Sequence, residues 1–330
     1  MRRSHGPDRI CRFIFLFSLL ALAGCSGKDD SLLDQPPVDM QTSEETEEHF
    51  PEELLQAVEP AADESQGGDP ETVTEEVDWS GYFGDVNGAA VIYDPKKNHY
   101  QIYRQELALT RRSPCSTFKI ISSLAALEYG IIEPDDSVRI WSGETFWNRE
   151  WNQDIDFTDA FHASCVWYFR EVVDEIGKDR MQEKLNQLSY GNCDISDWEG
   201  RLNTNNSNPA LTGFWLESSL LISPKEQTEV MERIFGEDTV VSEETRSQLE
   251  QVMCLADQEE TDITIYGKTG MGKANGIVVD AWFTGFADDA GRRIYFCIYM
   301  GETDHQEVSS AGARKTAVEI VSDYLRGGSG

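Results

Sequence analysis

The chain has 330 residues, of which 60 are acidic and 28 are basic, so its formal net charge is −32. This excess of negative charge argues against nucleic acid and anionic lipid headgroups as binding partners. The length allows one sizeable folded domain with additional segments outside it.

The first 25 residues have the pattern of an export signal. Four arginines precede an eleven-residue apolar run from Phe13 to Ala23, and small residues then lead to Cys25. The run is too short to span a bilayer as a helix. It resembles a bacterial lipoprotein signal, which implies that Cys25 becomes the lipidated first residue of the mature protein. We therefore expect an exported protein, lipid-anchored to the outer face of the bacterial cell membrane, or to the periplasmic side in a Gram-negative organism.

A strongly acidic segment follows, and we predict that residues 26–76 form a disordered linker. Between Lys28 and Asp78 there are 18 Asp or Glu residues, five prolines and a single lysine. Such a composition buries too little apolar surface to fold, and its charges repel one another. The segment carries 17 of the 32 net negative charges, so the acidity of the chain describes the linker more than the folded part.

Residues 77–326 are predicted to form one domain, followed by a flexible tail at 327–330. A strand pattern at 88–93 and another at 99–104 flank turn residues, which is typical of a hairpin. Further strands are predicted at 263–268, 278–286 and 292–300, and helices at 113–129, 158–176, 180–188, 225–235, 242–253 and 313–324. This order predicts an α/β fold of the α+β type: an antiparallel sheet of about five or more strands, flanked by helices, with an inserted all-helical lobe.

The cysteines and histidines predict neither a disulfide framework nor a metal site. Besides Cys11 and Cys25, five cysteines remain, an odd number without regular spacing, and we expect packed, reduced thiols. The five histidines are isolated from one another and lack ligand spacing, so we expect no metal.

Ser116 and Lys119 form the first candidate catalytic pair. Ser113–Pro114 predicts a helix start, which places Ser116 in the opening turn and Lys119 three residues later on the same face. A serine hydroxyl needs an adjacent base, and a lysine serves as one when burial lowers its pKa. The opening turn also offers unpaired N–H groups to an oxyanion. A capped core helix with an ordinary lysine is the alternative.

Two later motifs add candidate site residues. Ser164 is predicted within the helix at 158–176, where its hydroxyl could relay a proton to a leaving nitrogen, or simply bond a helix carbonyl. Lys268-Thr269-Gly270 is predicted at the end of a strand. There an ammonium and a hydroxyl could hold a substrate carboxylate while the glycine allows close approach; an exposed strand end is the alternative.

The order of these motifs resembles that of the penicillin-recognising serine enzymes, and the chain is similar to the class D β-lactamases in particular. Ser164-Cys165-Val166 matches the class D S-x-V pattern. The resemblance covers residues 77–326 and includes four further segments: Tyr190-Gly191-Asn192, Phe214-Trp215-Leu216-Glu217, Trp282-Phe283-Thr284-Gly285 and Ala313-Arg314-Lys315. It implies the β-lactamase fold and a serine acyl-enzyme on Ser116.

The resemblance also implies roles for individual residues. In this family the lysine matching Lys119 takes up carbon dioxide as a carbamate, which is the general base for acylation and deacylation; no other cofactor is expected. Trp215 would donate its indole N–H to that group, and Val166, Leu216 and Phe118 would keep the lysine dry. The remaining roles are proton transfer by Ser164, an oxyanion hole from the backbone N–H groups of Ser116 and Met271, and a carboxylate site of Lys268, Thr269, Gly270 and Arg314.

Three departures from the family pattern stand out. Residues 197–212 are longer than usual and include a polar run at 203–209, which makes the placement of Trp215 less secure. Ala281 stands where a glycine is common. Cys115 precedes the candidate nucleophile where a small residue is usual, and we interpret it as a packing residue.

Two other functions stay open beside β-lactam hydrolysis and resistance. One is a β-lactam sensor that stops at a stable acyl-enzyme, which the lipoprotein signal and the apolar Val166 disfavour. The other is a peptidoglycan transpeptidase or carboxypeptidase, which the Y-G-N and F-W-L-E matches disfavour. We expect small-molecule β-lactams as partners, no nucleic acid, and a monomer or weak dimer.

Overall fold

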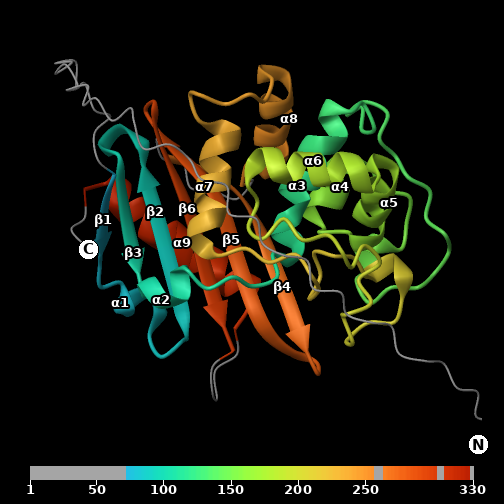
Figure 1. The fold of residues 1–330 in the computed structure, drawn as a ribbon, viewed down its shortest axis with the longest axis horizontal. Helices are drawn as coiled ribbons and strands as arrows, with labels where there is room; N and C mark the ends of the chain where they lie inside the picture. Colours follow the sequence, from blue (N-terminus) through green and yellow to red (C-terminus); the bar gives the residue numbers. More distant parts are fainter. Residues whose placement is uncertain (1–71, 256–262, 303–307, 328–330) are drawn as a thin grey trace, which may run out of the picture. The chain divides into compact units, whose positions relative to one another are not determined.

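A six-stranded sheet organises the fold of the computed structural model, which describes residues 72–255, 263–302 and 308–327 (Figure 1). The strands are β1 (Val73–Glu76), β2 (Gly88–Asp94), β3 (His99–Tyr103), β4 (Ile263–Ala274), β5 (Ile277–Asp289) and β6 (Arg292–Gly301). Their order across the sheet is β1-β3-β2-β6-β5-β4. All neighbouring strands pair antiparallel except β1, which runs parallel to β3.

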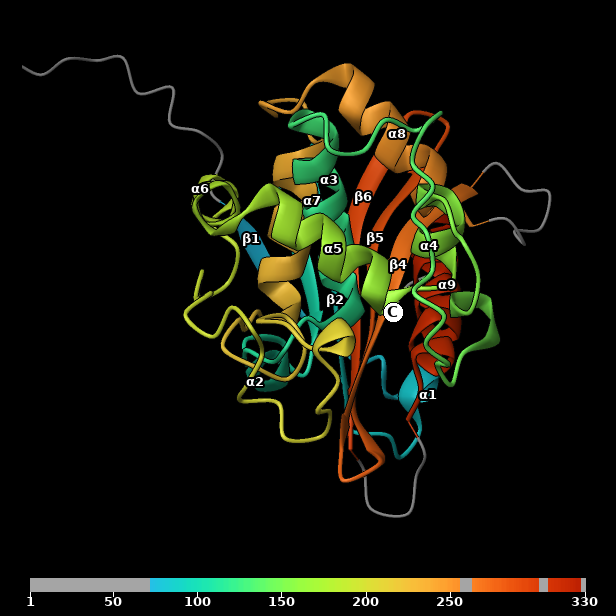
Figure 2. The same cartoon turned by 90° about the vertical axis from the view of Figure 1, so that its right-hand side faces the viewer.

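Two long helices cover the sheet, and a group of helices lies beside β4. Helix α7 (Pro224–Phe235) packs on one face and α9 (Ser310–Leu325) on the other (Figure 2). The lobe beside β4 contains α3 (Lys119–Glu128), α4 (Phe157–His162), α5 (Val166–Ile176), α6 (Lys178–Leu188) and α8 (Glu243–Met253) (Figure 1). The short elements are α1 (Ser80–Phe83), α2 (Gln105–Ala108) and the 3-10 turns η1 (Pro95–Lys97), η2 (Cys115–Phe118), η3 (Arg149–Trp151) and η4 (Pro209–Leu211).

Local sequence explains where the main elements begin and turn. At α7, the Ser223 hydroxyl accepts the backbone N–H of Glu226, the Glu226 carboxylate accepts the backbone N–H of Ser223, and Pro224 occupies the first turn. In the β2–β3 hairpin, Asp94 accepts the N–H of Lys96, and Asn98 closes the turn in the left-handed conformation. The start of α7 and the β2–β3 turn therefore carry the residue types that their backbone geometry requires.

The α+β fold class predicted from the sequence is confirmed, and two local predictions need correction. Strand β1 lies at 73–76, inside the segment predicted as linker, so the folded part starts earlier than residue 77. The helix predicted at 158–176 is two helices, α4 and α5, with a break at 163–165. The predicted signal, Cys25 and most of the linker lie outside the described residues.

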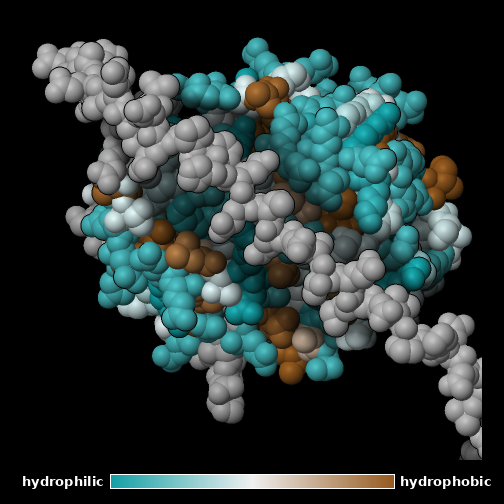
Figure 3. Space-filling model, in the orientation of Figure 1, coloured by the Kyte–Doolittle hydropathy of each residue, from teal (hydrophilic) through white to brown (hydrophobic). Residues whose placement is uncertain are grey.

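The surface of the described residues is mainly polar on the face that is drawn. The face in Figure 3 is mainly hydrophilic, with apolar residues in small separate patches between the grey atoms. Within the described ranges, no helix has the length and apolar character needed to cross a membrane.

Cys115, Cys165 and Cys297 are buried, and these three form no disulfide with each other or with the other two described cysteines.

Candidate active site

The structure brings Ser116 and Lys119 together at the start of the central helix. Ser116 lies in η2, Lys119 opens α3, and Lys119 Nζ donates to Ser116 Oγ at 2.9 Å. Ser113 does not cap the predicted helix start, because its hydroxyl donates to the Trp215 carbonyl at 3.0 Å and accepts the N–H of Glu217 at 2.8 Å. Ser113 therefore ties the nucleophile segment to the Phe214–Glu217 motif.

Lys119 is buried in apolar surroundings. Its side chain is 1% exposed, and its Nζ lies 5.5 Å from the centre of the Phe169 ring. Burial lowers the pKa of Lys119 to about 8. Its interactions with the other described residues include no carboxylate. An uncharged amine is therefore accessible beside the Ser116 hydroxyl near neutral pH.

Ser164 and Lys268 form a second pair, with positions that differ from those predicted. Ser164 lies in the break between α4 and α5 with a φ of 54°, not inside a helix. Lys268 lies within β4, paired with Thr284, and not at a strand end. Lys268 Nζ donates to Ser164 Oγ at 3.1 Å. Burial, and then the charge of Lys119, lower the pKa of Lys268 well below its usual value.

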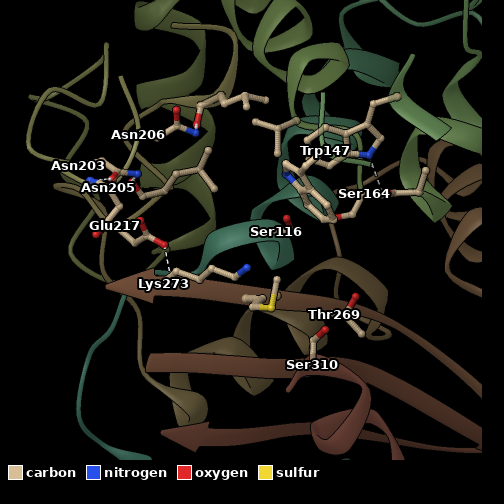
Figure 4. A pocket seen from close by; sticks show the side chains of 17 residues that line it. Ser116, Trp147, Ser164, Asn203, Asn205, Asn206, Glu217, Thr269, Lys273 and Ser310 are labelled. Carbon is tan, nitrogen blue, oxygen red and sulfur yellow. Dashed lines mark hydrogen bonds between the residues drawn. The ribbon is translucent and has the colours of Figure 1, made fainter. Parts of the chain in front are cut away.

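A pocket of about 340 Å³ opens onto these residues. Figure 4 shows Ser116 at the end of a helix, with Ser164 on one side of the pocket and Thr269 on the other. The predicted site residues that line it are Ser116, Ser164, Val166, Leu216, Thr269, Gly270 and Met271. Phe118, Lys119, Trp215 and Lys268 are buried and are not among its lining. Arg314 does not line it either, although Ser310, at the start of the same helix, does.

Trp215 is placed firmly despite the long insertion before it. It is 1% exposed, and its ring stacks on Phe118 with centroids 5.7 Å apart. Its indole Nε1 is buried and has no hydrogen-bond partner among the described residues. A buried donor without a partner is costly, so this nitrogen is suited to an acceptor that the described residues do not supply.

The Tyr190-Gly191-Asn192 motif supports the segment that carries Trp215. The ring of Tyr190 meets Phe118 edge-on at 5.8 Å. The Asn192 side chain donates to the Ser219 carbonyl at 2.8 Å and accepts the N–H of Leu221 at 2.9 Å. These bonds fix the chain just after the Phe214–Glu217 motif, so the role of Y-G-N visible here is structural.

Replacing Gly191 by alanine should destabilise the domain strongly. Gly191 has a φ of 54°, and an added Cβ would lie 2.0 Å from the Leu221 carbonyl oxygen. We expect a loss of about 2 kcal/mol or more in the free energy of unfolding, measured by urea denaturation. Gly81→Ala is the matched control, because Gly81 lies in α1 with open space around it. Equal stability of the two variants would contradict the crowding at Gly191.

Sequence reasoning missed several residues that line the pocket. Trp147 and Trp151 come from the loop around η3, and Lys273 comes from β4. The insertion contributes Asn203, Asn205, Asn206 and Leu211. Irregular loops of this kind carry no periodic signal, and the unusual length of the insertion was the one feature that drew attention to it. The two other departures are packing positions, since Ala281 and Cys115 are both fully buried.

The fold brings two serine–lysine contacts, Ser116–Lys119 and Ser164–Lys268, beside one pocket. Residues 88–325 match the family model described as the penicillin binding protein transpeptidase domain. The match covers well over half of the chain. The chain therefore belongs to the family of the penicillin-binding transpeptidase domain, and its homologues include class D β-lactamases.

The similar proteins include some named as β-lactamases and one named as a regulatory protein. The "Probable beta-lactamase YbxI" of Bacillus subtilis is 32% identical over 73% of this chain and 82% of its own length. The crystal structure of a class D β-lactamase from Bacillus subtilis has a TM-score of 0.64 at 29% identity, over 75% of this chain and 95% of that one. The "Regulatory protein BlaR1" of Bacillus licheniformis is 31% identical over 76% of this chain, but the chain spans only 39% of that relative. The similarity thus supports a β-lactam-related function.

Proposed function

We propose that this chain hydrolyses β-lactam antibiotics through an acyl-enzyme on Ser116. The observation that carries the proposal is the buried Lys119 amine, hydrogen-bonded to Ser116 Oγ at 2.9 Å. Trp215, whose indole N–H has no partner among the described residues, lies in the same hydrophobic cluster as Phe169, whose ring is near Lys119 Nζ. A general base and a nucleophile in contact are the minimum that acyl transfer requires.

In the acylation step, Ser116 Oγ attacks the lactam carbonyl and its proton passes to the base at Lys119. The backbone N–H groups of Ser116 and Met271 would hold the oxyanion. When the ring C–N bond breaks, the nitrogen takes up a proton, and Ser164 is suited to deliver it because its hydroxyl already accepts a hydrogen bond from Lys268.

The substrate carboxylate would bind between Thr269 and Lys268. Thr269 lines the pocket, and the buried Lys268 amine lies 3.4 Å from its hydroxyl. Burial disfavours the ammonium form of Lys268, and a carboxylate beside it would restore that form. Gly270 lets β4 lie close to the segment that carries Ser116, since an added Cβ would lie 2.9 Å from the Pro114 carbonyl oxygen. The role of Arg314 stays a prediction, because Arg314 lies outside the pocket lining.

The residues of the site fit the carbon dioxide-derived carboxyl group that the resemblance implies on Lys119. A neutral amine is required to take it up, and the pKa of Lys119 is lowered to about 8. Trp215 would hold it through the indole N–H that lacks an acceptor among the described residues. When bound, the group supplies a carboxylate-like base for Ser116 and later for the hydrolytic water.

Val166→Asn should weaken the uptake of carbon dioxide. Val166 opens α5 and lines the pocket, three residues before Phe169, whose ring is near Lys119 Nζ. An amide there makes the pocket more polar, so the pKa of Lys119 rises and less neutral amine is present. We expect the bicarbonate concentration for half-maximal activity to increase about tenfold. The value for Val166→Thr should lie between those of Val166→Asn and the wild type. Unchanged bicarbonate dependence would contradict the dry-pocket argument.

The test of the proposal is turnover of a chromogenic cephalosporin with and without bicarbonate, combined with intact mass. A hydrolase opens the reporter repeatedly and leaves no lasting adduct. The similarity to BlaR1 favours one second candidate, a β-lactam sensor. A single acylation whose adduct persists for hours would select the sensor. Lipid attachment at Cys25 and the location at the cell membrane stay predictions, because Cys25 lies outside the described residues.

A further inference from the structure

Glu217 connects three parts of the site through one carboxylate. Its Oε1 accepts the backbone N–H of Lys273 in β4 at 2.5 Å, and its Oε2 accepts the side-chain amide of Asn205 at 3.3 Å. Asn205 in turn accepts the N–H of Asn275 at 2.9 Å, in the turn between β4 and β5. Figure 4 shows the link from Glu217 to Lys273 along one side of the pocket. The carboxylate thus joins the Trp215 turn, the insertion and β4.

The bond to Lys273 falls where the sheet pairing changes. The register of β4 against β5 shifts between Gly272 and Lys273. A Cβ on Gly272 would lie 3.0 Å from Cys115 Sγ and 3.3 Å from Glu217 Oε1, so the glycine lets the carboxylate lie against the strand. Lys273 is two residues beyond Met271. Glu217 therefore fixes β4 next to the N–H that we assign to the oxyanion hole.

The backbone of Glu217 is tied to the nucleophile segment. Glu217 has a φ of 52°, a conformation that a glutamate adopts only when its surroundings enforce it. Its N–H donates to the Ser113 hydroxyl at 2.8 Å, and the N–H of Cys115 donates to the Trp215 carbonyl at 3.0 Å. Burial raises the pKa of the Glu217 carboxyl, although the N–H of Lys273 favours its charged form. A desolvated carboxylate on a strained backbone lowers the stability of the fold. Such costly arrangements are concentrated at functional sites, which favours a role for Glu217 in the site.

We propose that Glu217 is a positioning residue that holds the backbone N–H groups of Ser116 and Met271 at a fixed separation. Its backbone N–H is hydrogen-bonded to Ser113, in the segment before Ser116. Its carboxylate is hydrogen-bonded to the backbone of Lys273, in β4 just after Met271. This inference rests on the proposed acylation of Ser116 and not on hydrolysis of the acyl-enzyme. The two oxyanion donors come from separate elements, so their spacing depends on a connection of this kind.

The test follows acylation of the full chain by a fluorescent penicillin in rapid-mixing experiments. For Glu217→Ala we expect the first-order acylation constant to fall by about 10²-fold, because a small displacement of one donor is enough. The dissociation constant of the noncovalent complex should stay within about twofold, since the substrate-binding side chains are retained. Glu217→Gln keeps an acceptor oxygen for Lys273 and should recover most of the lost rate. Glu244→Gln, at an exposed site in the first turn of α8, is the matched control and should acylate like wild type.

Two results would overturn the inference. One is a folded Glu217→Ala variant, by circular dichroism, whose acylation constant lies within about threefold of wild type. If that variant does not fold, Asn205→Ala decides, because it leaves the Glu217 carboxylate in place and removes the amide that links Oε2 to the turn at Asn275. The inference expects about a threefold to tenfold slower acylation for Asn205→Ala, and an unchanged constant overturns it. Wild-type protein that acylates without turnover would refute the hydrolase proposal and leave this one testable.

Discussion

Replacing Lys119 by alanine is expected to lower the hydrolysis of a chromogenic cephalosporin by about 10³-fold or more, because general-base catalysis contributes on that scale. Lys119 Nζ is the group that contacts Ser116 Oγ, and the lysine is buried away from water. Its loss leaves the serine hydroxyl near its ordinary, weakly nucleophilic state. Steady-state kinetics at saturating bicarbonate measures the effect, and added bicarbonate should not rescue the variant.

Two companion variants separate loss of the base from loss of packing. Lys119→Met fills the same buried space without an amine, so it should be as inactive as the alanine variant while leaving a smaller cavity. Lys178→Ala removes an exposed lysine at the start of α6 and should retain wild-type turnover. Turnover by Lys119→Met within about tenfold of wild type would rule out a base at this position.

Trp215→Phe is expected to trap the acyl-enzyme. Phenylalanine keeps an aromatic ring against Phe118 but removes the indole N–H, which has no acceptor among the described residues. If that N–H holds the base required for deacylation, turnover should fall by about 10²-fold, the usual cost of one electrostatic donor. Intact mass spectrometry should then show an acyl adduct that outlasts the wild-type adduct, and more bicarbonate should be needed for activity.

Trp282 offers a closely matched control. Its indole Nε1 is also buried without a partner among the described residues, and its ring packs on Tyr299 at 4.6 Å. Trp282 lies in β5 and does not line the pocket. Trp282→Phe makes the same chemical change and should leave deacylation intact. Equal effects of the two substitutions would mean that indole loss acts through stability rather than through Lys119.

The parts of the site that depend on local spacing could be predicted from the sequence. Ser116 and Lys119 are three residues apart in a helical turn, so their contact follows from helix geometry. The β2–β3 hairpin and the strands of the β4–β6 meander also follow from local patterns. The residues alone also indicated Ser164 and Lys268 as candidates, and the family resemblance added Trp215.

The remaining features depend on contacts between distant segments. Ser164 breaks the helix through a left-handed backbone, and the apolar pattern on both sides of it hid the break. The strand pattern predicts an end at Lys268, yet β4 continues to Ala274 through its pairing with β5. Glu217 and Asn205 are 12 residues apart and meet only in three dimensions. All four residues of β1 are exposed and two are acidic, so its pairing with β3 is what reveals the strand.

The placement of β1 has a mechanical consequence. Strand β1 forms one edge of the sheet, and β4, which carries Lys268, forms the other, with four strands between them. A pull on the chain before Val73 loads the short pairing of β1 with β3 first. If β1 detaches, the pairings from β3 across to β4 are untouched, and so is the pocket beside β4. Tension on the N-terminal side is therefore separated from the reacting atoms by the full width of the sheet.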